Sequence, residues 1–175
     1  TPYIQEAYQL YHPKFFHYAA AYFMRFNRLF FINNTWTLYQ SIRILTMWTS
    51  VMTLLIGYRY IKKAHFSPFG ELIATLFLCF SPIFYRLAGM TNNDNFMVFF
   101  LTIAIYNTAL FYRKPNFISI LGVAFGIGLA MASKLSGGLV ALPIAVVFLI
   151  VLIKSIREAK MEHNFRPTLK LLTMF

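Results

Sequence analysis

The stretch TNNDNFMVFFLTIAIYNTALFYR, residues 91–113, carries most of the information about the fold. It begins with a cluster of polar side chains, continues through an apolar run at 96–112 and ends on Arg113, which Lys114 follows. A bilayer core about 30 Å thick requires about 20 mostly apolar helical residues to cross it. The stretch therefore predicts a membrane-crossing helix with a polar mouth at one end and cations at the other.

Four further apolar runs extend this pattern in both directions. They cover residues 36–60, 69–87, 117–132 and 137–153. The chain is 59% apolar and 12% charged, which is far from the composition of a soluble domain. The runs predict an all-α fold, a polytopic transmembrane helix bundle with about five spanning helices between residues 36 and 153. The third and fourth runs, at 96–112 and 117–132, are short and suit the interior of a bundle.

The net charge of +11 raises the question of a nucleic-acid partner. The basic residues, however, fall in short clusters between apolar runs, so membrane lipids are the expected partner and nucleic acid is not. The clusters follow the first, third and fifth runs, and the last one opens a basic segment at 154–175 that leads into a further apolar helix. Because basic loops tend to be cytoplasmic, this alternation predicts a multi-pass protein whose polar mouth at 91–95 is extracytoplasmic. The membrane would be the plasma membrane in a prokaryote or the ER membrane in a eukaryote.

Residues 1–35 are rich in aromatic side chains but contain no apolar run long enough to cross a membrane. Five of these residues recur at helical spacing, namely Phe15, Ala19, Tyr22, Phe23 and Phe26. Aromatic side chains favour the membrane interface. The segment is therefore predicted to be an extracytoplasmic juxtamembrane loop with a helix lying along the outer leaflet. An aromatic anchor without a chemical role explains the same pattern.

Asp94 is the only aspartate of the chain and lies in the polar mouth, between Asn93 and Asn95. A helix N-cap requires a short acceptor side chain just before the first apolar turn, and capping alone explains one residue of this cluster. Several consecutive amide and carboxylate side chains exceed that requirement. They favour a polar site that binds a hydroxylated ligand, although capping remains the alternative.

Cationic side chains are predicted near the same mouth, at the outer ends of other segments. They are His12, Lys14, Arg86 and Lys134. Cations at headgroup level attract a lipid phosphate, which arginine can bind through two hydrogen bonds. Ordinary headgroup contact is the alternative for each of them. Arg43 lies about two turns inside the first run, where an isolated charge is costly unless it reaches water or a polar cavity, and this position indicates a function.

Small residues and the single cysteine indicate packing and not cofactor chemistry. Gly122, Gly126, Gly128 and Ala132 lie along one predicted helix and favour close helix contact. No strand precedes the glycines, so they do not form a dinucleotide-binding loop. Cys79 has no second cysteine for a disulfide or a thiolate metal cluster. The sequence predicts neither a metal site nor a cofactor.

Four local matches, two of them made of two segments each, resemble in their order one known arrangement of a membrane enzyme. They are His12-Pro13-Lys14-Phe15-Phe16-His17-Tyr18, Ser41-Ile42-Arg43-Ile44-Leu45, Ser81-Pro82, Asn93-Asp94, Gly128-Leu129-Ala130-Met131-Ala132-Ser133-Lys134 and Leu142-Pro143. Together they resemble the GT-C superfamily of glycosyltransferases, in its protein O-mannosyltransferase and aminoarabinose-transferase-like branch, glycosyltransferase family 39. The first motif is similar to the HPPLYY or KPPLYY stretch of that branch, with Lys14 at the position of the second proline.

The resemblance implies transfer of a sugar from a polyprenyl-phosphate-linked lipid donor to an acceptor hydroxyl at the extracytoplasmic face, normally with inversion. The acceptor would be a protein, a lipid or a glycan. The family also has an acidic residue in its first outer loop, which would lie upstream of Thr1. The chain is therefore expected to be an interior piece of a longer mannosyltransferase-like enzyme.

Position-matching to the family also implies roles for individual residues. Asp94 matches an acidic site residue that orients the acceptor or the substrate. The residues matched to, or placed near, the substrate are His12, Lys14, Arg43, Arg86, Asn93 and Lys134. Of these, His12 and Lys14 would lie near the lipid phosphate.

Two other functions fit parts of the pattern. A transporter or channel also uses a charged residue inside a span and glycine-rich helices, but it predicts polar residues near the middle of several spans. A non-catalytic membrane scaffold subunit would leave the residues at 92–95 as a helix cap only. Both remain alternatives at the level of sequence.

Overall fold

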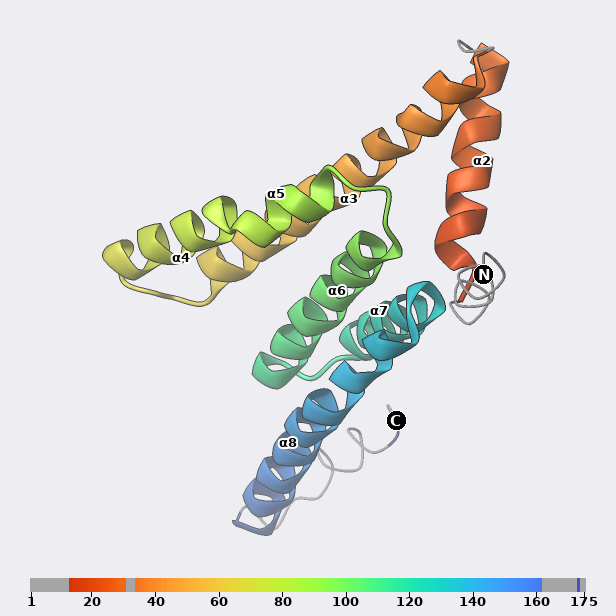
Figure 1. The fold of residues 1–175 in the computed structure, drawn as a ribbon. Coiled ribbons are helices and arrows are strands. Elements are labelled where there is room, and N and C mark those ends of the chain that lie inside the picture. The colour runs from red at the N-terminus through yellow and green to blue at the C-terminus, as the bar shows by residue number, and fades with distance from the viewer. Residues whose placement is uncertain (1–12, 31–33, 162–172, 174–175) are drawn as a thin grey trace, which may run out of the picture.

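The computed structural model describes residues 13–30, 34–161 and 173. Within these residues all regular structure is helical, so the predicted all-α fold is confirmed (Figure 1). The elements in chain order are α2 (Phe15–Phe30), α3 (Thr35–Lys63), α4 (Pro68–Phe80), α5 (Pro82–Ala88), α6 (Asn93–Arg113), α7 (Phe117–Ser133), the 3₁₀ helix η1 (Leu135–Val140) and α8 (Ala141–Met161).

Three helical segments of the described chain are long and apolar enough to cross a membrane. They are Thr35–Lys63, Asn93–Arg113 and Leu135–Met161. The helices Pro68–Phe80 and Phe117–Ser133 are apolar but shorter. The chain is thus an integral membrane helix bundle, with three of the five predicted spans at full crossing length and two below it.

The run at 69–87, which is predicted to be one spanning helix, is divided into two helices because a proline interrupts it. α4 ends at Phe80, Ser81 adopts an extended backbone with φ −65° and ψ 116°, and α5 begins at Pro82. Proline disfavours the helical conformation in the residue before it and offers no N–H to the preceding turn. The run therefore forms two helices, of 13 and 7 residues.

α6 and α7 form an antiparallel pair at the centre of the bundle. The side-chain amide of Asn93, at the start of α6, donates a hydrogen bond to the carbonyl oxygen of Ser133 at the end of α7, at 3.3 Å. The two backbones approach closely at Gly126, where an added Cβ would lie 2.7 Å from the backbone nitrogen of Ala104. A Cβ at Gly128 would meet nothing within 4 Å. The predicted small-residue stripe therefore packs through some of its glycines and not through all of them.

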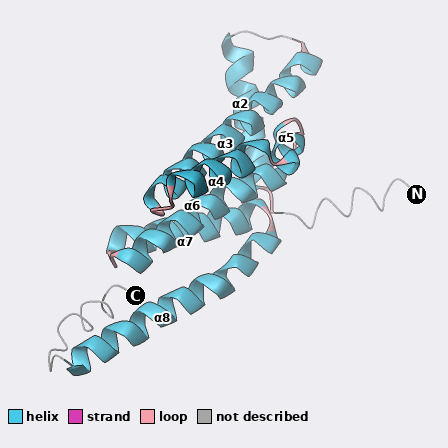
Figure 2. Ribbon diagram, turned by 90° about the vertical axis from the view of Figure 1, so that its left-hand side faces the viewer, coloured by secondary structure: helices cyan, strands magenta, loops and turns pink. Residues whose placement is uncertain are grey.

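α3 packs on a side of α6 that α7 does not cover, and α4 and α5 run back along α3 (Figures 1 and 2). Much of the contact between α3 and α6 is made by polar side chains. Thr46, Ser50 and Thr53 of α3 are between 0% and 4% exposed, and Asn95 of α6 is 1% exposed. Small hydroxyl side chains let two helices approach closely and hydrogen-bond across the contact. The buried face of α3 is therefore mostly polar, with Ile42 and Ile61 as its buried apolar residues.

The aromatic N-terminal segment contains the predicted helix, α2. Asn27 of α2 donates a hydrogen bond to the hydroxyl of Ser41 on α3 at 3.1 Å. Tyr22 and Phe26, which the helical spacing placed on the apolar face, are 68% and 57% exposed. These two side chains do not pack on the rest of the described chain, and the placement of α2 along the outer leaflet stays a prediction.

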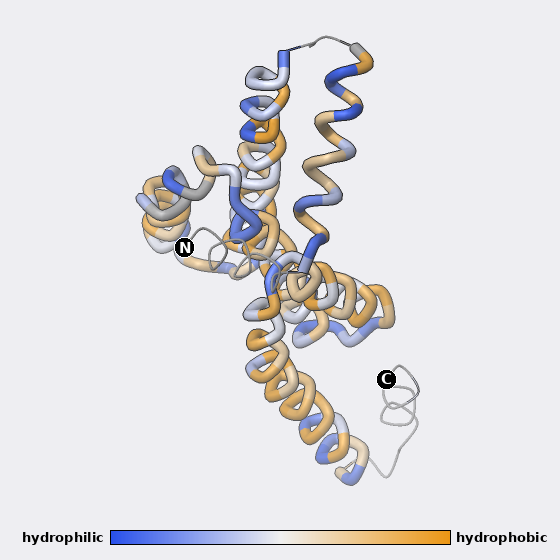
Figure 3. Tube along the Cα trace, turned by 45° about the vertical axis from the view of Figure 1, so that its right-hand side comes forward, coloured by the Kyte–Doolittle hydropathy of each residue, from blue (hydrophilic) through white to orange (hydrophobic). Residues whose placement is uncertain are grey.

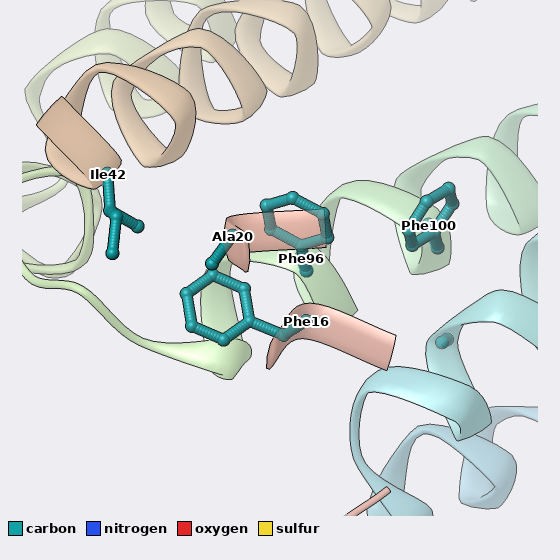
Figure 4. Packing of buried hydrophobic residues seen from close by; sticks show 6 residues of the cluster. Phe16, Ala20, Ile42, Phe96 and Phe100 are labelled. Carbon is teal, nitrogen blue, oxygen red and sulfur yellow. The ribbon is translucent and has the colours of Figure 1, made fainter. Parts of the chain in front are cut away.

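The apolar core that joins α2 to the bundle is shown in Figure 4. Phe16 and Ala20 of α2 pack with Ile42 of α3 and with Phe96 and Phe100 of α6. The rings of Phe16 and Phe96 meet edge to face, with centroids 5.2 Å apart. Phe96 lies within one turn of the polar start of α6, so its packing in this cluster helps to hold that turn in position.

α8 leaves the bundle after its first turns. Figure 3 shows it as an almost continuous hydrophobic tube that becomes hydrophilic near its end. Ile144 packs in a cluster with Ala104 of α6, and the ring of Phe148 stacks on Phe111 with centroids 4.3 Å apart. Most other side chains of α8 are exposed, as expected for a helix whose surroundings are lipid.

Candidate functional site: the first turn of α6

The candidate site begins at the cap of α6. Asn92 is the N-cap, with extended backbone at φ −140° and ψ 143°. Its side-chain oxygen accepts a hydrogen bond from the backbone N–H of Asp94 at 3.2 Å, and its amide group donates to Oδ2 of Asp94 at 2.9 Å. Asn92 therefore performs the capping that the sequence also allowed for Asp94. The carboxylate of Asp94 is left for other contacts, at the helix end where a negative charge is stabilised.

The partner of that carboxylate is Lys134. Its Nζ lies 2.5 Å from Oδ1 of Asp94, and the two side chains are 31% and 27% exposed. Lys134 follows the last residue of α7 with an extended backbone at φ −157° and ψ 128°, which turns the chain away from the helix axis. A charge-assisted bond of this kind is stronger than one between neutral groups. It joins residues 40 positions apart in the sequence.

A buried polar layer lies directly beneath this ion pair. The side-chain amide of Asn95 donates to the carbonyl oxygen of Thr46 at 2.6 Å and to the hydroxyl of Ser50 at 2.8 Å. The hydroxyl of Thr46 in turn lies 3.4 Å from the carbonyl oxygen of Ala88, at the end of α5. The first turn of α6 is thus bonded to α3 through Asn95 and to the end of α7 through Asn93 and Asp94.

Thr46 and Ser50 were not among the site residues predicted from the sequence. The spacing of hydroxyl residues in the sequence does indicate them. Thr46, Thr49, Ser50 and Thr53 recur at i, i+3, i+4 and i+7 within an otherwise apolar run. Hydroxyl side chains at that spacing occupy one face of a helix, and in a membrane such a face contacts another helix.

The structure does not join the other predicted cations to Asp94. Lys14 is exposed and immediately precedes α2, Arg43 is exposed on α3, and Arg86 is exposed on α5. Within residues 13–30 and 34–161, the ion pair to Asp94 comes from Lys134 and not from these three. His12 lies outside the described residues. The role of these four cations stays a prediction.

The chemistry available at the mouth is the binding of hydroxyl groups and anions. A carboxylate offers about four lone-pair positions, so Asp94 retains acceptor capacity beyond its bonds to Asn92 and Lys134. The ammonium of Lys134 has three donors, and one bond to Asp94 leaves two. Within the described part of the chain, no group of three or more His, Cys, Asp or Glu side chains is arranged to hold a metal ion.

Comparison with known proteins identifies the family. The sequence profile of the dolichyl-phosphate-mannose-protein mannosyltransferases matches residues 12–171, which include every helix described above. A search of curated proteins and a search of solved structures gave no significant match. The family match covers most of the chain, both residues of the ion pair and the polar layer beneath it. The chain therefore belongs to the dolichyl-phosphate-mannose-protein mannosyltransferase family.

Proposed function

We propose that the mouth at the start of α6 is part of the active site of a membrane mannosyltransferase. The enzyme takes its sugar from a polyprenyl-phosphate-linked donor and transfers it to a hydroxyl group of a protein, lipid or glycan acceptor. Family membership supports membrane mannosyltransferase activity in broad terms. The single observation that carries the finer proposal is the Asp94–Lys134 pair, an anion and a cation 2.5 Å apart at a partly exposed end of two helices.

Asp94 is proposed to orient the acceptor hydroxyl or the sugar. One of its oxygens is held by Lys134 and the other by Asn92, so the carboxylate has a fixed direction. A fixed acceptor of hydrogen bonds lowers the entropy cost of aligning a hydroxyl with the reacting carbon. In the reaction, the acceptor oxygen forms a bond to the anomeric carbon as the bond from that carbon to the phosphate oxygen breaks. The hydroxyl proton passes to a general base, for which an acidic residue elsewhere in the enzyme is proposed.

Lys134 is proposed to stabilise the phosphate group of the lipid donor. Negative charge grows on the phosphate oxygen as the sugar leaves, and a nearby ammonium stabilises that charge. Asn93, whose amide bonds to the carbonyl oxygen of Ser133, holds the chain before Lys134 in position. The remaining candidates for the phosphate are His12, Lys14, Arg43 and Arg86, which the resemblance places near the substrate.

The proposed side of the membrane is the extracytoplasmic one. The support is the distribution of basic residues, which cluster after α3, α6 and α8, at the helix ends opposite to Asp94 for α3 and α6. Basic clusters mark cytoplasmic loops in short-loop membrane proteins. A transporter is less well supported, because the buried polar side chains Ser50 of α3 and Asn95 of α6 bond to each other.

The test is the substitution Asp94→Asn in the intact protein. It keeps the shape of the side chain and removes the charge, so the fold is retained. We expect sugar transfer from a polyprenyl-phosphate-mannose donor to fall about 100-fold or more, since loss of alignment costs rates of that order. The measurement is transfer of radiolabelled mannose in membranes that contain equal amounts of each variant.

The matched control is Glu71→Gln. Glu71 also forms an ion pair with a lysine, Lys62, but at the opposite end of the bundle. The same carboxylate-to-amide change there should leave transfer unchanged. Equal turnover of Asp94→Asn and Glu71→Gln would remove Asp94 from the active site.

A further inference from the structure

A groove on the side of the bundle, between α6 and α8, is separate from the mouth that holds Asp94. Its volume is about 650 Å³. Ile105 and Ala109 of α6 and Pro143 and Val147 of α8 form much of its wall. These side chains offer no polar group to a ligand, so this part of the groove suits a hydrocarbon chain.

One end of the groove is polar and cationic. Tyr60 of α3 and Tyr112 and Arg113 of α6 line it there. The guanidinium of Arg113 donates one hydrogen bond to the carbonyl oxygen of Lys63, and it has five N–H donors in all. Phenol and guanidinium groups together provide donors for an anionic oxygen at the membrane interface.

The surroundings of this end are also basic. Arg59 precedes Tyr60 and Lys114 follows Arg113 in the sequence, and both are exposed. The ammonium of Lys63 donates a hydrogen bond to the hydroxyl of Tyr106 at 2.9 Å. The nearest acidic residue on α4, Glu71, is engaged by Lys62. The local charge is therefore positive, which attracts anionic lipids more strongly than zwitterionic ones.

The dimensions of the groove match one leaflet of a bilayer. From Ile105 to Arg113 the helix rises about 12 Å, and half of a hydrocarbon core of about 30 Å is about 15 Å. Asp94 and Arg113 lie at opposite ends of α6, a helix of 21 residues that is about 30 Å long. The groove therefore opens to the leaflet opposite to the mouth, far from the proposed transfer reaction.

We propose that this groove binds one anionic phospholipid, with an acyl chain between α6 and α8 and its phosphate beside Arg113. Charge complementarity selects this occupant, because the cationic end pairs with a phosphate and the apolar wall pairs with a chain of one-leaflet length. The bound lipid fills the space between two helices that touch through few side chains and holds α8 against α6. This site is independent of the proposed sugar transfer.

The experiment uses the intact protein in detergent with equal amounts of phosphatidylglycerol and phosphatidylcholine that carry identical acyl chains. Native mass spectrometry counts the lipids that stay bound. We expect one phosphatidylglycerol to be retained in preference to phosphatidylcholine. Arg113→Gln should weaken its retention about five-fold, as expected for loss of one basic residue at the membrane surface. The control Arg157→Gln, an exposed basic residue on α8 outside the groove, should leave it unchanged.

A second variant guards against a change of fold in Arg113→Gln. Val147→Trp fills the apolar part of the groove and leaves all cations in place, so it should also release the lipid. Equal retention of the two lipids, or unchanged retention in both variants, would overturn the proposal. Two results together would also overturn the proposal: absence of bound lipid, and a disulfide crosslink between Ala109→Cys and a cysteine introduced in another helix. They would show that protein fills the groove.

Discussion

α3 and α8 are both long enough to cross a membrane, yet they use their side chains in opposite ways. In α3, 33% of the apolar window is buried inside the protein, whereas in Leu135–Met161 only 11% is buried. The second segment is the more apolar of the two. In this chain the more apolar helix is thus the less buried one.

The reason lies in what each face contacts. The buried residues of α3 include Thr46, Ser50 and Thr53, while Trp48 and Leu55 of the same helix are 62% and 48% exposed. Lipid is as apolar as leucine, so apolar side chains gain little from contact with another helix. Small hydroxyl groups gain hydrogen bonds and close packing there. Hydropathy therefore places a helix in the membrane, and small polar residues select the helix that packs against it.

The largest effect is expected where two backbones touch. Gly126→Ala adds a Cβ that would lie 2.7 Å from the backbone nitrogen of Ala104 and 2.8 Å from the carbonyl oxygen of Phe100. Backbone atoms cannot move aside as a flexible side chain does, so α6 and α7 must separate. We expect the free energy of unfolding to fall by about 1–3 kcal/mol. The measurement is an unfolding titration with SDS in mixed micelles.

The matched control for that change is Gly128→Ala, two residues along the same helix. A Cβ there meets nothing within 4 Å, so stability should be unchanged or slightly raised. Equal destabilisation by the two substitutions would mean that the face of Gly128 is also packed in the intact protein. That result would contradict the assignment of Gly126 to a helix-facing position and of Gly128 to a lipid-facing one.

A smaller effect is expected in the polar contact between α3 and α6. Asn95→Leu removes the amide that donates to Thr46 and Ser50. Interhelical hydrogen bonds in membranes contribute about 1 kcal/mol, and the free energy of unfolding should fall by about that amount. Thr102→Val is the control, because among the described residues the hydroxyl of Thr102 bonds within α6, to the carbonyl oxygen of Val98. If both variants unfold at the same SDS fraction, the polar contact does not select the partner of α3.

The smallest effect is expected on the lipid-facing side of α8. Leu142 and Leu149 are 71% and 55% exposed. Leu142→Ala and Leu149→Ala exchange one lipid contact for another, so each should change the free energy of unfolding by less than about 0.5 kcal/mol. The same SDS titration applies. A loss above 1 kcal/mol would show that another helix, and not lipid, covers this face.

The sequence predicted the fold class and the position of the polar mouth, but not how the mouth is built. Asp94 could be placed at a helix start because the polar cluster precedes an apolar run. The division of work between Asn92, which caps the helix, and Asp94, which binds Lys134, could not be read from spacing, since either side chain is a suitable cap. The break at Pro82 was readable, because proline and the residue before it have known backbone limits.

The sequence alone is enough to identify the segments apolar enough to lie in lipid and the polar segments between them. Hydropathy belongs to each residue and its close neighbours, so a local window suffices to find it. Only the tertiary structure decided which polar side chains meet, because the bonds from Asp94 to Lys134 and from Asn95 to Thr46 join residues 40 and 49 positions apart. Such pairs depend on the rotation and register of whole helices. These are set jointly by the many packing contacts along the helices.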